Sequence, residues 1–143
     1  MIVEEIMNTN VKTISPEDSS QEAAKMMKDS NVSCLIVVKT GKLVGILTEM
    51  DIIRNVTAEN RRAAEVPVEE IMTTDVIIIK PDLDVIDAAS VMIEKRIKKL
   101  PVVDNGKLLG IVTSMDIVHA EPEMIKHLAE LFLVTKKNKP MAG

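Results

Sequence analysis

A glycine, a threonine and an aspartate recur at fixed spacing in two places in this chain. The first stretch runs from Gly45 to Asp51 and the second from Gly110 to Asp116, and both have the order Gly-Ile-x-Thr-x-Met-Asp. A hydroxyl and free backbone N–H groups at the start of a helix can bind an oxygen-rich ligand. A carboxylate in the first turn can accept hydrogen bonds from both vicinal hydroxyls of a ribose. The spacing therefore predicts two equivalent sites for a ligand that carries a sugar or a phosphate.

Helix capping is the alternative explanation of the same spacing. Thr48 and Thr113 come where a strand-like apolar run gives way to a helix-like run, so each hydroxyl would serve as the N-cap of a helix. Gly45 and Gly110 precede them inside the strand-like run, where a missing side chain allows a ligand to approach the backbone closely. The residues alone leave capping and ligand binding both open.

The two stretches belong to a longer internal duplication. Residues 3–53 align without a gap to residues 68–118, and nearly half of the aligned positions are identical. Both copies open with Val-Glu-Glu-Ile-Met, which we expect to form a short helical turn. Because two copies are fewer than a solenoid needs, we expect a pseudo-symmetric pair with its ligand in the cleft between the copies.

Each copy has the pattern strand, helix, strand, strand, helix. Short β-prone runs at residues 11–14 and 76–79 are followed by a proline, and helix starts come next. Ser19, together with Glu22, has the spacing of a capping box, and Asp84 is the matching N-cap candidate in the second copy. The remaining strands are expected at 34–38, 43–47, 100–103 and 108–112, and the second helices near Met50 and Met115.

The organisation along the chain follows from the duplication. We predict a first repeat at 1–57, a linker at 58–66, a second repeat at 67–120, a C-terminal helix at 121–135 and a flexible tail at 136–143. Pro122 suits the first turn of the C-terminal helix. One apolar stripe of this helix comprises Ile125, Leu128, Leu131 and Phe132. The stripe would either close over the module or pack against a partner subunit.

Composition argues against several kinds of partner. The net charge is −4 and aromatic residues make up 1% of the chain, with no Trp and no Tyr, so we do not expect nucleic acid to bind. No apolar run reaches the length of a membrane span, and the acidic start of the sequence is unlike a signal peptide.

Cysteine and histidine content argues against further chemistry. Cys34 is the sole cysteine, which excludes an internal disulfide and favours a cytoplasmic location; we expect it to be buried and inert in a strand. His119 and His127 lack the spacing of a metal site. Neither copy has a catalytic triad, a Walker loop or a metal cluster, so we expect no enzyme activity.

Taken together, these motifs resemble those of the CBS domain, named after cystathionine β-synthase. The resemblance depends on both Gly-x-x-Thr-x-x-Asp stretches, the Leu-Pro-Val-Val-Asp run from Leu100 to Asp104 and the repeated Val-Glu-Glu-Ile-Met, and it covers residues 1 to about 120. It implies an α/β (α+β) fold in which two pseudo-twofold-related β-α-β-β-α repeats form one Bateman module.

The resemblance also implies a ligand and the residues that bind it. Such modules bind AMP, ADP, ATP or S-adenosylmethionine as regulatory ligands, with no obligatory cofactor. Aspartate holds the ribose, threonine holds ribose or phosphate, and backbone of the first strand contacts the adenine. These roles fall here on Thr13, Ile14, Thr48, Asp51, Thr113 and Asp116.

The two copies differ at positions that could set the ligand. Thr13 is matched by Ile78 in the second copy, and Arg54, one helical turn after Asp51, is matched by His119. Arg54 is therefore a further candidate ligand residue in the first copy only.

A pair of lysines distinguishes the second copy. Lys98 and Lys99 stand where the first copy has Ser33 and Cys34. In similar proteins, such as the regulatory subunit of AMP-activated protein kinase, basic residues at these positions reach the ligand phosphate. The resemblance implies that they act across the pseudo-twofold and serve the ligand held by Thr48 and Asp51; a solvated basic cluster is the alternative.

The resemblance favours a regulatory module that changes shape or partner affinity when its ligand binds, through a shift in conformational populations. It also implies a homodimer formed through helices. The alternative is a structural adaptor, or a regulatory partner of a separate enzyme or transporter, whose ligand sites are vestigial.

Overall fold

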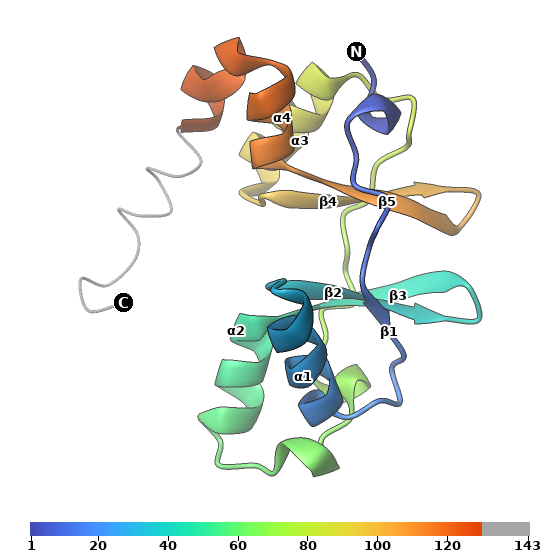
Figure 1. Ribbon diagram of the computed structural model, residues 1–143, viewed down its shortest axis with the longest axis vertical. Coiled ribbons are helices and arrows are strands. Elements are labelled where there is room, and N and C mark those ends of the chain that lie inside the picture. Colours follow the sequence, from blue (N-terminus) through green and yellow to red (C-terminus); the bar gives the residue numbers. More distant parts are fainter. Residues whose placement is uncertain (130–143) are drawn as a thin grey trace. The chain divides into compact units, whose positions relative to one another are not determined.

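The computed structural model describes residues 1–129, which divide into two units of packed structure (Figure 1). Unit 1 comprises residues 1–9, 77–105 and those from Leu109 onward, and unit 2 comprises residues 10–76 and 106–108. The units therefore do not coincide with the two sequence repeats, because each includes the leading segment of the other copy.

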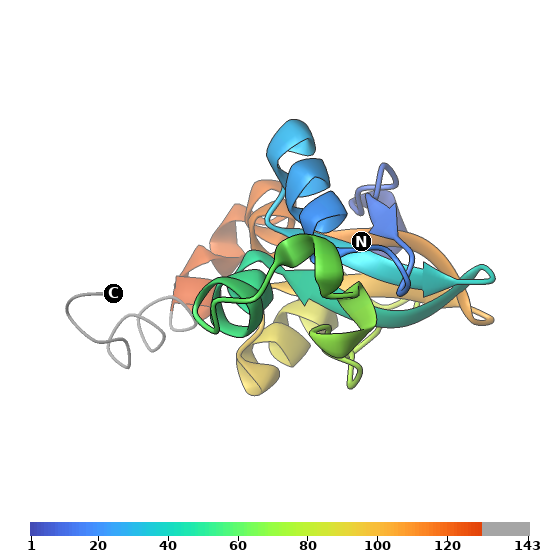
Figure 2. The same ribbon diagram turned by 90° about the horizontal axis from the view of Figure 1, so that it is seen from below.

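Unit 2 contains the predicted order of elements. These are β1 (Thr13–Ile14), α1 (Ser20–Ser30), β2 (Cys34–Lys39), β3 (Lys42–Thr48) and α2 (Glu49–Ile52), which continues as the π-helical turn η2 (Ile53–Thr57). Strand β1 is parallel to β2, and β2 is antiparallel to β3. Helices α1 and α2 lie beside this hairpin in both views (Figures 1 and 2). Two 3-10 turns follow, η3 (Ala63–Glu65) and η4 (Val68–Glu70).

Unit 1 has the equivalent elements. They are the 3-10 turn η1 (Val3–Glu5), α3 (Val85–Lys95), β4 (Lys99–Asp104), β5 (Lys107–Thr113), α4 (Ser114–Ala120) and the 3-10 turn η5 (Pro122–Met124). The mixed α/β fold expected from the sequence is thus confirmed.

Local sequence signals explain the element boundaries. The Ser19 hydroxyl accepts a hydrogen bond from Glu22 N at 3.1 Å, and the Asp84 carboxylate accepts one from Ile86 N at 2.8 Å, which confirms both predicted N-caps. Asn105 and Gly106, at the tip of the β4–β5 hairpin, have φ values of 51° and 78°, as a tight hairpin turn requires.

The strand predicted at residues 76–79 is wrong. Only Ile79 bridges a neighbouring strand, with its N–H bonded to Pro101 O and its C=O to Val103 N. Extending the parallel ladder would require an N–H from Pro101, which proline lacks. The first copy has Ile36 at that position, and its N–H donates to Lys12 O at 3.2 Å, so β1 forms, although it is shorter than the predicted run.

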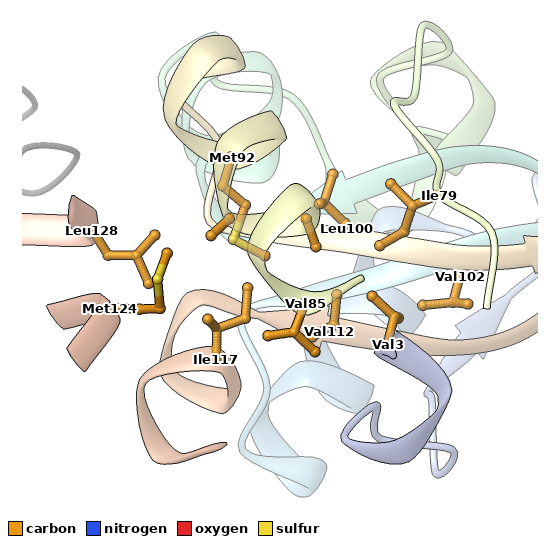
Figure 3. Close-up of a cluster of buried hydrophobic side chains, with 12 residues drawn as sticks. Val3, Ile79, Val85, Met92, Leu100, Val102, Val112, Ile117, Met124 and Leu128 are labelled. Carbon is orange, nitrogen blue, oxygen red and sulfur yellow. The ribbon is translucent and has the colours of Figure 1, made fainter. Parts of the chain in front are cut away.

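Each unit has its own apolar core. In unit 1 the core gathers side chains from α3, β4, β5 and α4 (Figure 3), namely Val85, Met92, Leu100, Val102, Val112 and Ile117, with Val3 of the leading segment. The unit 2 core contains Ile14, Met27, Leu35, Val37, Leu47 and, from the second leading segment, Val68.

The C-terminal helix is described only as far as residue 129. Leu128 is buried in the unit 1 core with Met124, whereas Ile125 is 56% exposed, so the predicted stripe is wrong at Ile125. Leu131, Phe132 and the predicted tail at 136–143 lie outside the described residues.

Candidate functional site

The first Thr-x-x-Asp stretch forms a capping box at the start of α2. The Thr48 hydroxyl accepts a hydrogen bond from Asp51 N at 3.2 Å, and Asp51 Oδ2 accepts one from Thr48 N at 2.9 Å. The helix begins here because these two reciprocal bonds satisfy backbone N–H groups that have no partner within the helix. Both side chains remain half-buried.

The second stretch has the same geometry at the start of α4. The Thr113 hydroxyl accepts from Asp116 N at 3.2 Å, and Asp116 Oδ2 accepts from Thr113 N at 2.9 Å. Position for position, the two capping boxes are therefore built alike, as the duplication predicts.

Capping does not use the whole carboxylate. Among residues 1–129, no group donates a hydrogen bond to Oδ1 of Asp51 or of Asp116. A carboxylate has about four lone-pair sites on two oxygens, so one oxygen can cap while the other accepts from a ligand hydroxyl. Capping and ligand binding are thus compatible in the same residue.

The interpretation of the two glycines needs correction. A Cβ on Gly45 would meet Met72 Sδ at 2.7 Å and Thr73 O at 2.9 Å, and one on Gly110 would meet Asn8 O at 2.8 Å. The protein's own leading segments fill the space that the sequence suggested for a ligand. These glycines are required for packing, because any side chain would collide with backbone.

The remaining first-strand candidates lie in β1. The Thr13 side chain is exposed, while Ile14 is 4% exposed and packs in the unit 2 core, so only its backbone is available to a ligand. In the second copy, Ile78 is 48% exposed and offers no hydroxyl.

The lysine pair lies beside the second Thr-x-x-Asp stretch in unit 1. Ser114 N, in the first residue of α4, donates to Lys98 O at 2.9 Å. Glu49 N donates in the same way to Ser33 O at 3.0 Å in unit 2. The backbone of Lys98 is therefore next to Thr113. Action of the Lys98 side chain on a ligand held by Thr48 and Asp51 stays a prediction.

The other candidates are placed as follows. Arg54 is exposed in the π-helical turn that follows α2. Cys34 lies in β2 as predicted but is only half-buried, and His119 and His127 are exposed. No group of metal-ligating side chains occurs within the described residues.

Sequence reasoning missed the importance of Met7 and Met72. Both sulfurs pack against a strand glycine, Met7 on Gly110 and Met72 on Gly45. The signal was available, since both methionines end the identical Val-Glu-Glu-Ile-Met segments.

None of the helices in the described part of the chain has the length and apolar character needed to cross a membrane.

Comparison with known proteins identifies the family. The CBS domain family matches residues 3–58 and 68–123. The CBS domain-containing protein YhcV of Bacillus subtilis is 40% identical over 115 residues, which are 80% of this chain and 81% of that protein. Inosine-5'-monophosphate dehydrogenase of Korarchaeum cryptofilum is 40% identical over 113 residues, which are 78% of this chain but 22% of that enzyme.

Solved structures agree. The conserved CBS domain protein TA0289 of Thermoplasma acidophilum has a TM-score of 0.82 at 31% identity, covering 97% of this chain and 78% of that one. The CBS domain pair of MJ0100, solved in complex with 5-methylthioadenosine and S-adenosyl-L-methionine, has a TM-score of 0.74 at 37% identity, covering 84% and 98%. With two matched domains spanning most of its length, this chain belongs to the CBS domain family as a tandem pair of CBS domains.

Proposed function

We propose that this protein is a non-catalytic regulatory module that binds an adenosine-containing ligand at its Thr-x-x-Asp stretches. The observation that carries the proposal is the second carboxylate oxygen, Oδ1, which accepts no hydrogen bond from the described residues at either Asp51 or Asp116. The similar CBS domain pair of MJ0100 was solved with two adenosine-containing ligands, which supports the ligand class.

The binding chemistry follows from the capping geometry. Asp51 Oδ1 or Asp116 Oδ1 would accept hydrogen bonds from the ribose hydroxyls, while Oδ2 keeps the helix start in place. The Thr13 hydroxyl and β1 backbone would contact the ligand in the first copy, and Arg54 would add positive charge. The location of the ligand in a cleft between the copies stays a prediction from the sequence.

The lysines would select among adenosine ligands. Lys98 and Lys99 would attract a phosphate, so AMP, ADP or ATP would bind where they act, whereas the other site would accept a less charged ligand such as S-adenosylmethionine. Ligand binding would favour one conformation of the module by its differential affinity for the two states.

We further infer a homodimer in the cytoplasm. Met50 and Ile53 on the first of the two equivalent helical segments are 43% and 51% exposed, and Met115 on α4 is 52% exposed. Such apolar residues are candidates for a contact between copies. The cytoplasmic location is favoured because the chain has a single cysteine and no possible internal disulfide.

The alternative is an adaptor or a regulatory partner of a separate enzyme or transporter whose ligand sites are vestigial. The capping boxes favour it to the extent that they give both Thr/Asp pairs a structural role without a ligand. We do not propose catalysis, since the match to the dehydrogenase covers 22% of that enzyme.

One experiment separates these functions. Freshly purified protein is denatured and the released small molecules are identified by mass spectrometry, followed by calorimetric titration with AMP, ATP, S-adenosylmethionine and 5-methylthioadenosine. A near-stoichiometric adenosine compound, or saturable binding that Asp51→Asn or Asp116→Asn weakens, supports the module. Blank results in both measurements would favour the adaptor.

A further inference from the structure

The leading segments of the two copies are placed in exchanged positions. Residues 1–9, the first strap, pack in unit 1 with the elements of the second copy. Residues 66–73, the second strap, pack in unit 2 with the elements of the first copy. Five residues, Val-Glu-Glu-Ile-Met, are identical in the two straps. The same short segment is thus recognised twice.

Backbone hydrogen bonds join the first strap to the turn before α3, to the first residue of α3 and to β5. In Figure 1 the dark blue segment crosses the orange strand β5. They are Val3 N to Leu83 O at 2.8 Å, Glu4 N to Pro81 O at 3.0 Å, Asn8 N to Ile111 O at 2.8 Å and Val85 N to Met1 O at 3.0 Å. We call the receiving residues, Pro81, Leu83, Val85, Gly110 and Ile111, the first seat.

The second strap makes the matching set of bonds at the equivalent positions. They are Val68 N to Asp18 O at 2.8 Å, Glu69 N to Pro16 O at 3.0 Å, Thr73 N to Ile46 O at 2.9 Å and Ser20 N to Val66 O at 2.8 Å. Because two different seats bind the same five residues in the same way, recognition depends on the segment and not on its place in the chain.

Side chains add specificity to the first seat. Val3 is fully buried in the unit 1 core (Figure 3), and Ile6 packs against that core. The Met7 sulfur lies 2.9 Å from the position of a Cβ on Gly110, a contact that a larger residue at 110 would prevent. The first seat therefore takes an extended apolar segment with a buried valine and a methionine at its end.

One hydrogen bond distinguishes the two straps. The buried Ser20 hydroxyl also donates to Val66 O at 2.8 Å, whereas its counterpart Val85 has no hydroxyl to offer Met1 O. The first strap therefore lacks the counterpart of this one hydrogen bond, although its terminal ammonium lies 4.0 Å from Asp84 Oδ2. It is also joined to unit 2 through residues 9–12, which form no helix or strand.

We propose that the first strap is exchangeable between molecules, so that the first seat of one molecule binds residues 1–9 of a second copy of this chain. Exchange of an identical element about a hinge is a low-cost route to a dimer, because every contact of the closed monomer is preserved. The hinge here is the irregular stretch at residues 9–12. This inference does not depend on the adenosine ligand.

Concentration decides between the closed and the exchanged forms. A short tether gives the molecule's own strap an effective concentration of about 1 mM, so the closed form, with each strap in its own seat, dominates at about 10 μM. Refolding at about 1 mM protein makes the strap of a second molecule an equal competitor. We expect the exchanged fraction to rise at least about tenfold between these two conditions.

A disulfide reports which strap occupies the seat. Ile2 and Asp84 form an antiparallel bridge flanked by the bonds of Val3 and Val85, a pair whose Cα atoms lie about 4.5 Å apart and suit a disulfide. The variant Ile2→Cys/Asp84→Cys is made in a Cys34→Ser background and refolded with a glutathione redox couple at both concentrations. Non-reducing electrophoresis should show monomer at 10 μM and, after refolding at 1 mM, a reducible dimer.

The matched control places the disulfide on the second strap, at the equivalent bridge between Ser19 and Pro67. Both residues belong to the nearly continuous chain of unit 2, so Ser19→Cys/Pro67→Cys should remain monomeric at both concentrations. A monomer from the Ile2/Asp84 variant at 1 mM would overturn the proposal. Equal dimer from the control, or from either single-cysteine variant, would overturn it as well.

A second design needs no engineered cysteine. Gly110→Val blocks the first seat, because its side chain would occupy the position of Met7. Val3→Asp prevents the first strap from binding, because it would place a charge in the apolar core. Circular dichroism checks that each variant folds. When differently tagged forms are mixed and refolded, the intact strap of one can enter the intact seat of the other, and we expect a heterodimer. Because the homodimer proposed above would pair any two tagged chains, the readout is the excess of heterodimer over that formed by two differently tagged Val3→Asp chains. No excess in the complementary mixture of folded variants would contradict strap exchange.

Discussion

Thr48 N donates to Asp51 Oδ2 at 2.9 Å, while Asp51 Oδ1 accepts no hydrogen bond from any residue within 1–129. Asp51→Asn keeps an amide oxygen that can accept from Thr48 N but removes the charge. We expect the free energy of unfolding to change by less than about 1 kcal/mol, and ligand affinity at this site to fall about tenfold or more. Urea unfolding and calorimetric titration measure the two effects.

Thr48→Ala is the matched control, because it removes the N-cap hydroxyl. Stability should fall by about 0.5–2 kcal/mol. If Asp51→Asn costs as much stability as Thr48→Ala and leaves ligand affinity unchanged, the aspartate serves only the helix.

Gly110→Ala should be strongly destabilising because its Cβ would lie 2.8 Å from Asn8 O. Overpacking against backbone typically costs about 1–3 kcal/mol. Urea unfolding measures the loss. Met7→Ala in the same chain should recover little of it, since the Asn8 carbonyl remains; full recovery would show that only the flexible methionine is in the way.

Gly106→Ala separates crowding from backbone strain. Gly106 has a φ of 78° and nothing within 4 Å of a Cβ, so its substitution introduces strain alone. We expect a cost of about 1–2 kcal/mol there. Met7→Ala should not alter that cost, because Met7 packs on Gly110 and not on Gly106.

Glu121 closes the C-terminus of α4, and its pKa is raised above the ordinary value by its hydrogen bond with Glu123 and by the charge of that carboxylate. The folded state thus binds this proton more tightly than the unfolded state, so stability falls as pH rises from the ordinary value through the raised pKa. Glu121→Gln should therefore raise the melting temperature at about pH 7, with the gain fading as pH falls to about 4.

Glu123→Gln should raise the melting temperature less than Glu121→Gln does. The pKa of Glu123 is lowered, first by a backbone hydrogen bond and then by the hydrogen bond with Glu121. A lowered pKa stabilises the fold above the ordinary value, and this stabilisation is lost as pH falls through the folded pKa. At about pH 7 the substitution removes the same repulsion with Glu121 but also weakens the backbone hydrogen bond; a gain equal to or larger than that of Glu121→Gln would contradict this assignment.

Lys98 next to Thr113 predicts discrimination between ligands. Lys98→Ala should weaken ATP about tenfold while leaving S-adenosylmethionine within about twofold, since a charge-assisted contact to phosphate is lost. Lys95→Ala, an exposed lysine at the end of α3, is the control. If Lys98 acts on the neighbouring stretch, its effect should vanish in Asp116→Asn and persist in Asp51→Asn. The reverse result would support action on the ligand of Thr48 and Asp51.

The sequence allowed the family, the element order and the capping residues to be predicted, because each depends on a local pattern. Thr48, Thr113, Ser19 and Asp84 all cap helices as their spacing suggests. The duplication likewise predicted two sites of the same geometry.

The packing of the straps could not be predicted in this way. Identity between residues 3–7 and 68–72 shows that the segments are alike, but it does not say which copy each one packs against. The role of the glycines could not be predicted for the same reason. A glycine in a strand indicates that something approaches its backbone closely, but the sequence does not show whether this is a ligand or, as at Gly45, the side chain of Met72. The missing strand at 76–79 depends on Pro101, a residue far away in sequence.

The exchanged straps also fix an order of assembly during synthesis. Apart from residues 106–108, unit 2 is one continuous stretch, residues 10–76, and can fold once that stretch has left the ribosome. Val3 N can form its hydrogen bond only after Leu83 has been synthesised, and Asn8 N only after Ile111 has been synthesised. The first strap, although it is translated before unit 2, therefore reaches its native position only after unit 2 can fold. Until the β4–β5 hairpin is complete, each nascent chain carries an unbound Val-Glu-Glu-Ile-Met segment.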